Sequence, residues 1–332
     1  MSTEDNLIGL DVGTSRLVVA RQDAGEAFCE FESQLNAFVS VPFSRMTEGA
    51  LRRERVPFHV QGAEIVVHGN EAPRFADLLN TETRRPMTQG VLNPGEKDGL
   101  PVIRRLIETM TSRGGGQPKI CFSVPAAPLN AEEGLTYHEA TLRQMFEELN
   151  YEVRSINEGL AVVFSELEDT NYTGIGISCG GGLCNVCLAY LSLPAMSFSM
   201  AKAGDFIDTS AASVIGDLAN RVRLTKEENF YFNGHFSDKL QQVLTVYYDD
   251  MIYSLVNSMK EAFSNTRRMP KLSKPLPIVL SGGTASPRGF RDRFERILRQ
   301  TDFPIQVSEI RMAKDPCTAT ARGALVAAMA EM

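Results

Sequence analysis

Three glycine-bearing turns at the ends of short apolar segments are the parts of this sequence best suited to hold an anion. They are Asp11–Ser15, Gly180–Gly182 and Gly282–Thr284. A glycine-rich turn at the end of a strand lets bare backbone N–H groups approach phosphate oxygens. Asp11 stands at the mouth of the first turn, where a carboxylate would meet a cation, and Glu158 lies in a loop before the second turn. Each turn alone is compatible with an ordinary hairpin, but together they predict a phosphate and metal site.

The pattern of apolar residues indicates the elements that must position these turns. Leu7–Leu10 and Leu17–Ala20 are typical of two strands around the first turn, and Gly174–Tyr190 repeats that form around the second. The basic run Arg52–Arg55 is expected in a solvated connection, although an interaction edge is an alternative. Further strands are expected at 119–124, 153–156, 278–280 and 305–307, and helices at 70–79, 100–110, 136–149, 160–167, 206–219, 238–263, 288–299 and 318–329.

The alternation of strands and helices implies parallel strand pairing. Because the strand–turn–strand unit occurs once in each half, the sequence predicts an α/β protein of two related domains. Each domain would be a mixed sheet with flanking helices, and the two would face each other across a cleft.

Composition limits the class of protein. A length of 332 residues favours two domains, and 43% hydrophobic with 23% charged residues is ordinary for a soluble globular chain. The net charge of −7 argues against a large nucleic-acid surface, and no apolar run approaches the ~20 residues of a membrane span. The acidic start Met1–Asn6 has the character of neither a signal peptide nor an amphipathic anchor. We therefore expect a cytoplasmic protein with no nucleic-acid partner.

Five segments, in order along nearly the whole chain, resemble the motifs of the actin-like ATPase superfamily, which includes actin, Hsp70 and the sugar kinases. They resemble, in turn, its first phosphate loop, connecting segment, second phosphate loop, adenosine motif and closing helix: Leu10–Ala20, Ser155–Phe164, Gly176–Ala189, Pro277–Phe290 and Asp315–Ala328. The resemblance implies a two-domain actin-like fold of the ribonuclease H type with a nucleotide in the cleft.

Within the superfamily, length favours the bacterial actins. Arg85–Val91 is similar to a stretch of MreB-type actins, and Ala203–Asp208 and the pair Lys226–Glu227 are similar to stretches of MamK. By this resemblance, residues 1–150 form domain I, with a small subdomain at about 28–95. Residues 151–332 form domain II, with a small subdomain at about 205–275, and helix 318–330 returns to domain I.

The resemblance also implies sites for ATP and Mg²⁺. Asp11 would hold Mg²⁺ through water, and Glu158 stands where the family places the residue that orients the attacking water. These two are the expected catalytic residues. The expected nucleotide-binding residues are Gly13, Thr14, Ser15 and Arg16 of the first loop, Gly180, Gly181 and Gly182 of the second, and Gly204, Lys226, Glu227, Gly282, Gly283 and Thr284 toward the ribose and base.

The chain departs from the family pattern at the second loop. Ser178 replaces the acidic residue that opens this loop, Asn185 replaces the acidic or polar residue at its far end, and Gly159 stands where proline is usual. A serine hydroxyl brings no charge to a metal site. We therefore expect nucleotide binding to persist and hydrolysis to be weakened, since each ~1.4 kcal/mol of lost transition-state stabilisation is tenfold in rate. A degenerate site that binds no nucleotide remains an alternative.

The function that these observations favour is that of an ATP-binding, bacterial actin-like cytoskeletal protein. Its nucleotide-dependent filaments would organise cell shape or an intracellular structure, with at most a weak ATPase. The alternatives are a non-polymerising actin-like or Hsp70-like ATPase, a sugar-kinase-like phosphotransferase, and a nucleotide-sensing regulatory protein. We expect self-association, while other protein partners and membrane contact through an internal loop are left open.

Overall fold

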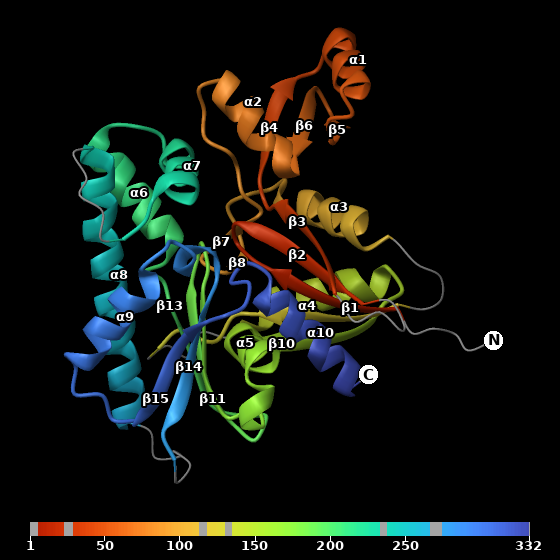
Figure 1. The fold of residues 1–332 in the computed structure, drawn as a ribbon. Coiled ribbons are helices and arrows are strands. Elements are labelled where there is room, and N and C mark those ends of the chain that lie inside the picture. Colours follow the sequence, from red (N-terminus) through yellow and green to blue (C-terminus); the bar gives the residue numbers. More distant parts are fainter. Residues whose placement is uncertain are drawn as a thin grey trace.

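A computed structural model describes residues 6–22, 29–112, 118–129, 135–232, 238–265 and 274–331. The acidic segment Met1–Asp5 lies outside these residues. Two five-stranded mixed sheets organise the molecule, one in each half of the chain (Figure 1). In spatial order, the first sheet contains β3 (Glu30–Leu35), β2 (Arg16–Arg21), β1 (Leu7–Val12), β9 (Lys119–Val124) and β10 (Glu152–Asn157).

The second sheet repeats this arrangement. In spatial order, it contains β13 (Leu193–Met200), β12 (Cys184–Tyr190), β11 (Gly174–Cys179), β14 (Leu276–Ser281) and β15 (Val307–Met312). In both sheets the first three strands are antiparallel neighbours, and the last two continue parallel to the central strand. The predicted duplication is therefore confirmed at the level of the sheets, although β13 was not among the predicted strands.

Helices cover the sheets on both sides. The first sheet packs against α3 (Gly99–Thr111) and α4 (Thr136–Glu148), and the second against α6 (Gly204–Ile215), α8 (Lys239–Asn265) and α9 (Phe290–Arg299). Helices α5 (Glu158–Glu166) and α10 (Ala319–Glu331) pack together between the two halves (Figure 1). Gly323 permits their close approach, because a Cβ atom there would lie 1.8 Å from the carbonyl oxygen of Ala161.

The helix predicted over 206–219 corresponds to α6, which ends before residue 219, and the helix that follows it was not predicted. Helix α6 ends at Ile215 because Gly216 adopts a left-handed conformation with φ of 80°, which caps the helix. Helix α7 (Ala219–Asn229) then begins in a new direction. This break brings α7 to the junction between the two halves, where several candidate residues lie.

A smaller sheet of β4 (Phe38–Pro42), β6 (Glu64–His68) and β5 (Phe58–Gln61) projects from the first half with α1 (Arg45–Arg53) and α2 (Ala72–Leu78) (Figure 1). The solvated connection expected at Arg52–Arg55 is partly wrong, since Arg52 and Arg53 belong to α1. The hydroxyl of Ser44 caps this helix by accepting from the Thr47 N–H at 3.0 Å. The domain boundaries stay a prediction.

A short hairpin, β7 (Met87–Thr88) with β8 (Val91–Leu92), connects the small sheet to α3. Among the described helices, none combines the length and the apolar character that crossing a membrane requires.

Candidate functional site

The first candidate turn links β1 to β2 and is tight. The N–H of Gly13 donates to the carbonyl of Arg16 over 3.0 Å, and a Cβ atom on Gly13 would lie 2.7 Å from that carbonyl oxygen. Asp11 was expected in the turn, but β1 extends to Val12 and Asp11 pairs with Val18 across the hairpin. Asp11 is therefore held by a regular strand, which fixes the direction of its carboxylate.

The second candidate turn reaches over from the other half and touches the first. The Gly180 N–H donates to the Leu183 carbonyl over 2.9 Å, which leaves Gly181 and Gly182 at the tip. A Cβ atom on Gly181 would lie 2.1 Å from Oγ of Ser15, and one on Gly182 would lie 2.3 Å from Oγ1 of Thr14. At Gly182 a Cβ atom would also lie 2.8 Å from the backbone nitrogen of Gly90, so glycine is needed there for the two turns to approach this closely.

A pair of carboxylates lies behind the turns. Asp11 accepts a hydrogen bond from the Ser123 hydroxyl over 2.8 Å, and the same hydroxyl accepts from the Val12 N–H over 2.9 Å. Burial raises the pKa of Asp11 to about 6, against the opposing effect of the Ser123 hydrogen bond. Ser123 is thus the residue that orients Asp11.

Glu158 is the first residue of α5 and not a loop residue as expected. The side chain of Asn157 caps this helix by accepting from the backbone N–H groups of Gly159 and Leu160. A Cβ atom on Gly159 would lie 2.7 Å from the backbone nitrogen of Cys187, so the helix start packs directly on β12. This contact gives the physical reason for glycine in place of proline in the connecting segment.

The two departures from the family motif both contact Glu158. Ser178 donates to Oε2 of Glu158 over 3.2 Å, and the Asn185 amide donates to the same oxygen over 2.9 Å. Ser178 and Asn185 face each other across β11 and β12. Burial, followed by the nearby Asp11 carboxylate, raises the pKa of Glu158 to about 8, while these two hydrogen bonds act in the opposite direction.

The carboxylate pair fits a divalent cation. Asp11 accepts from a serine hydroxyl, and Glu158 accepts from a serine hydroxyl and an asparagine amide, and none of these donors carries a positive charge. Burial raises the pKa of both carboxyl groups, and the Asp11 carboxylate raises that of Glu158 further, so a cation would stabilise the charged forms. Carboxylate oxygens are also the ligands that Mg²⁺ prefers.

The third candidate turn is tied to the second. The Thr284 hydroxyl donates to the Gly180 carbonyl over 2.7 Å, and the Gly204 N–H donates to the same oxygen over 3.1 Å. Lys226 is buried, with Nζ 2.8 Å from Asp208 and 3.3 Å from the Gly204 carbonyl. Thr284 therefore holds Gly180 in place, and Lys226 holds Gly204. Gly283 faces open space, since a Cβ atom there would have nothing within 4 Å.

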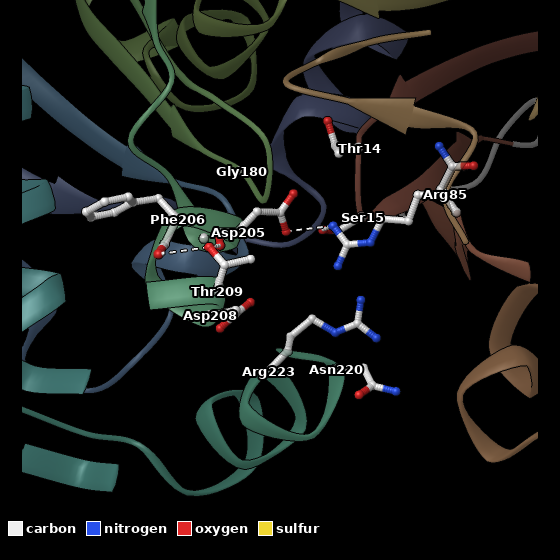
Figure 2. Close-up of polar contacts among 12 residues, drawn as sticks. Thr14, Ser15, Arg85, Gly180, Asp205, Phe206, Asp208, Thr209, Asn220 and Arg223 are labelled. Atoms are coloured by element: carbon white, nitrogen blue, oxygen red, sulfur yellow. Dashed lines mark hydrogen bonds and ion pairs between the residues drawn. The ribbon is translucent and has the colours of Figure 1, made fainter. Parts of the chain in front are cut away.

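Ion pairs join the two halves across their junction. Arg16 lies 3.0 Å from Glu227, and Arg85 lies 2.6 Å from Asp205 and 3.4 Å from Oγ of Ser15 (Figure 2). Near the outer edge, Arg221 of α7 pairs with Asp77 of α2 over 2.9 Å. The carboxylate of Glu82 also accepts from the first N–H groups of α7, those of Ala219 and Asn220.

The structure thus gathers the predicted residues in one region, and their roles stay a prediction. It also adds three residues whose part was not foreseen: Ser123, Arg85 and Asp205. Ser123 carried a signal, because it is the polar residue in the otherwise apolar run Ile120–Val124. Arg85 and Asp205 lay inside stretches that resembled bacterial actins, but nothing in the sequence joined them.

Comparisons with known proteins agree with the geometry. A family model described as Volactin matches residues 7–328. Among solved structures, the "MamK double helical filament" is 18% identical over 97% of this chain and 98% of that chain, with a TM-score of 0.72. A non-polymerising MamK mutant bound to AMPPNP is 20% identical over 98% of this chain and 99% of that chain, with a TM-score of 0.60.

MreB5 of Spiroplasma citri bound to ADP is 13% identical over 96% of this chain and 94% of that chain, with a TM-score of 0.63. No curated protein matches the chain. At these identities the structural matches show the fold, which is the actin-like fold that the five motifs predicted.

Proposed function

The chain belongs to the Volactin family, and from its actin-like fold and the facing turns we propose that it binds ATP and forms filaments under nucleotide control. The observation that carries the proposal is the contact between the two glycine turns, Gly181 against Ser15 and Gly182 against Thr14. Turns of this kind present backbone N–H groups to phosphate oxygens. Solved relatives bound to AMPPNP and to ADP support a nucleotide as the ligand.

The proposed nucleotide contacts follow the predicted order. Residues 13–16 and 180–182 would hold the phosphates, while Gly283, Glu227 and Gly204 would lie toward the base and ribose. Glu227 is half-exposed beside Arg16, and Gly283 has open space in front of it, so both have room for a ligand. Thr284 and Lys226 would act by holding Gly180 and Gly204 in place.

Mg²⁺ would be held by Asp11 through water and would supply charge stabilisation to the phosphates. Ser123 keeps the Asp11 carboxylate directed, and Ser178 with Asn185 fixes one oxygen of Glu158. Its other oxygen is left to orient a water molecule as a general base. With a serine in place of a carboxylate at 178, one negative charge near the metal is missing, so we propose that hydrolysis is slow.

The proposal of filaments is supported by the MamK relative, which was solved as a double helical filament. In the cell, such filaments would organise cell shape or an intracellular structure from the cytoplasm. We propose the same division into domains as the sequence suggested, with the first and second sheets as their centres.

A single sample tests binding and assembly in sequence. ATP is titrated with and without Mg²⁺, and the same protein is then centrifuged and viewed by electron microscopy with ATP or AMPPNP. We expect ATP binding that strengthens with Mg²⁺, followed by pelleting of filaments. If neither nucleotide binds, the site is degenerate and the proposal fails.

A second function, that of a nucleotide-sensing protein that does not polymerise, is favoured by one observation. Ser178 removes a charge that hydrolysis would use, but the turns remain in contact. Saturable ATP binding without pelleting at any protein concentration tested would select this alternative and exclude the cytoskeletal one.

A further inference from the structure

We propose that Arg85 distinguishes a nucleoside triphosphate from a diphosphate by exchanging its carboxylate partner, Asp205, for the terminal phosphate. This inference rests on the proposed nucleotide site and adds to it a residue that sets specificity. The state of Arg85 would then determine how firmly the two halves are joined.

Arg85 sits where the two phosphate turns meet. Its Nη1 lies 2.6 Å from Oδ1 of Asp205 and 3.4 Å from Oγ of Ser15. A Cβ atom on Gly181 would lie 2.1 Å from the same Ser15 oxygen and 3.4 Å from the same Asp205 oxygen. The guanidinium of Arg85 therefore lies between Ser15 of the first turn and Asp205, which is next to the second turn (Figure 2).

Asp205 occupies a fixed place on the other half. It lies in the first turn of α6, and its backbone N–H donates to the Gly181 carbonyl over 2.8 Å. Its carboxylate is an anion held at the tip of the second turn, so it presents to Arg85 the kind of group that a terminal phosphate would present.

The surroundings favour an additional anion. Arg223 of α7 is 3% exposed, and its Nη1 has no hydrogen-bond partner among the described residues. Burial, followed by the positive charge of Arg85, lowers the pKa of Arg223. Figure 2 shows its side chain extending from α7 toward the place where Arg85 and Asp205 meet. Glu227 also lies near Arg223, with 3.8 Å between its Oε1 and the arginine Nε, so Nη1 is the part of this guanidinium that is left for an additional anion such as a phosphate.

A phosphate competes well with a carboxylate for arginine. It offers more oxygens and a higher charge, and the planar guanidinium can bind it through two parallel hydrogen bonds. A nucleoside diphosphate lacks the third (γ) phosphate, so Arg85 would keep its ion pair with Asp205. The exchange would be transmitted through the segment that carries Arg85, because Gly90 in the same segment donates its N–H to Oγ1 of Thr14 over 2.9 Å.

The test compares dissociation constants for ATP and ADP, both with Mg²⁺, in the whole protein. In Arg85→Met we expect ATP affinity to fall roughly 10- to 100-fold while ADP affinity changes little, because charge-assisted hydrogen bonds to the terminal phosphate are lost. In Asp205→Asn we expect ATP affinity to rise, because Arg85 is released from its competitor. Arg85→Lys, which keeps the charge, should recover part of the ATP preference.

Arg221→Met is the matched control, since it removes another arginine that joins the two halves but lies at α7 beside Asp77. It should leave the ratio of the two dissociation constants unchanged. If Arg85→Met and Asp205→Asn weaken ATP and ADP equally, Arg85 is only a structural link and the inference is wrong. If the unmodified protein binds neither nucleotide, the proposed function itself fails.

Discussion

Ser178 donates a hydrogen bond to Glu158 over 3.2 Å, and so the residue that departs from the family motif contacts the carboxylate expected to orient water. The departure is therefore more than the loss of a charge. It replaces a third carboxylate with a donor that holds Glu158 in one orientation, beside the second donor Asn185. A carboxylate at 178 would instead repel Glu158 unless a cation lay between them.

The first prediction concerns Ser178→Asp. With Mg²⁺ we expect ATP turnover to rise about tenfold or more, because a restored charge near the metal is worth at least ~1.4 kcal/mol in the transition state. Without Mg²⁺ the variant should unfold at lower denaturant than the unmodified protein, since a third carboxylate joins a crowded pair.

Phosphate release and urea unfolding, each with and without Mg²⁺, measure these two effects. Ser178→Ala is the control, since it removes the hydroxyl and adds no charge. Unaltered turnover in Ser178→Asp with normal ATP binding would show that the missing charge at position 178 does not limit the rate of ATP hydrolysis.

The second prediction concerns Glu158→Gln. A glutamine retains an acceptor for Ser178 and Asn185 but removes the raised-pKa carboxylate. Stability at neutral pH should therefore be unchanged or higher, while ATP hydrolysis falls roughly 100-fold or more through loss of the general base. Single-turnover hydrolysis and ATP titration separate the two effects, and Glu147→Gln on the exposed side of α4 serves as the control. Retained hydrolysis would exclude Glu158 from the chemistry.

The third prediction concerns Gly182→Ala. The new methyl group would meet Oγ1 of Thr14 at 2.3 Å and the backbone nitrogen of Gly90 at 2.8 Å, so the two turns must separate. We expect the free energy of unfolding to fall by about 1–3 kcal/mol, as is usual for an overpacked contact, and ATP affinity to fall with it.

The matched control is Gly49→Ala in α1, where a Cβ atom would have nothing within 4 Å. It should raise helix stability by up to about 1 kcal/mol and leave nucleotide binding unchanged. Equal behaviour of the two alanine variants would show that the turns do not need to touch.

The fourth prediction concerns pH. Burial lowers the pKa of His138 from 6.5 to about 4, against the opposing effect of the Glu139 charge. The Nδ1 atom of this ring accepts from the Leu92 N–H. Between pH 6.5 and 4 the unfolded chain binds a proton here that the folded chain does not, so stability falls as pH falls. The full difference is roughly 3 kcal/mol at pH 4 and below.

Urea unfolding at several pH values between 7 and 4 measures this slope. His138→Asn keeps an acceptor for Leu92 without a titrating ring, and its stability should change less steeply over the same range. A slope equal to that of the unmodified protein would show that other groups cause the acid sensitivity.

Much of the fold follows from local pattern. The strands around Gly13 and Gly180 were predictable because apolar runs end there at glycine, and the long helices because their apolar residues recur at helical spacing. Helix α1 was not predicted because Leu51 is the one buried residue of this helix, so it lacks a recurring apolar pattern. Its many charged residues are also typical of an exposed loop. Strand β13 was missed because its first residues are exposed and Pro194 interrupts it.

The site was predictable where a motif carried it and not where distant residues meet. Asp11 and Glu158 stand in recognisable segments. The contact of Arg85 with Asp205 joins residues 120 positions apart. It exists because the Asp205 N–H donates to the Gly181 carbonyl, which holds the start of α6 at the second turn, and that turn lies against Ser15 of the first. A contact between residues so far apart in the chain cannot be predicted from the sequence around either of them.

The position of α10 has a consequence for synthesis on the ribosome. The strands of the first sheet have all been synthesised once Asn157 is made, but the helix that packs on β1 and β2 begins at Ala319. Until then, Val18, Ala20 and Cys121 lack the apolar neighbours that complete their side of the core. The nascent first half must therefore wait, with this face exposed to premature association or to a chaperone, while the second half is translated.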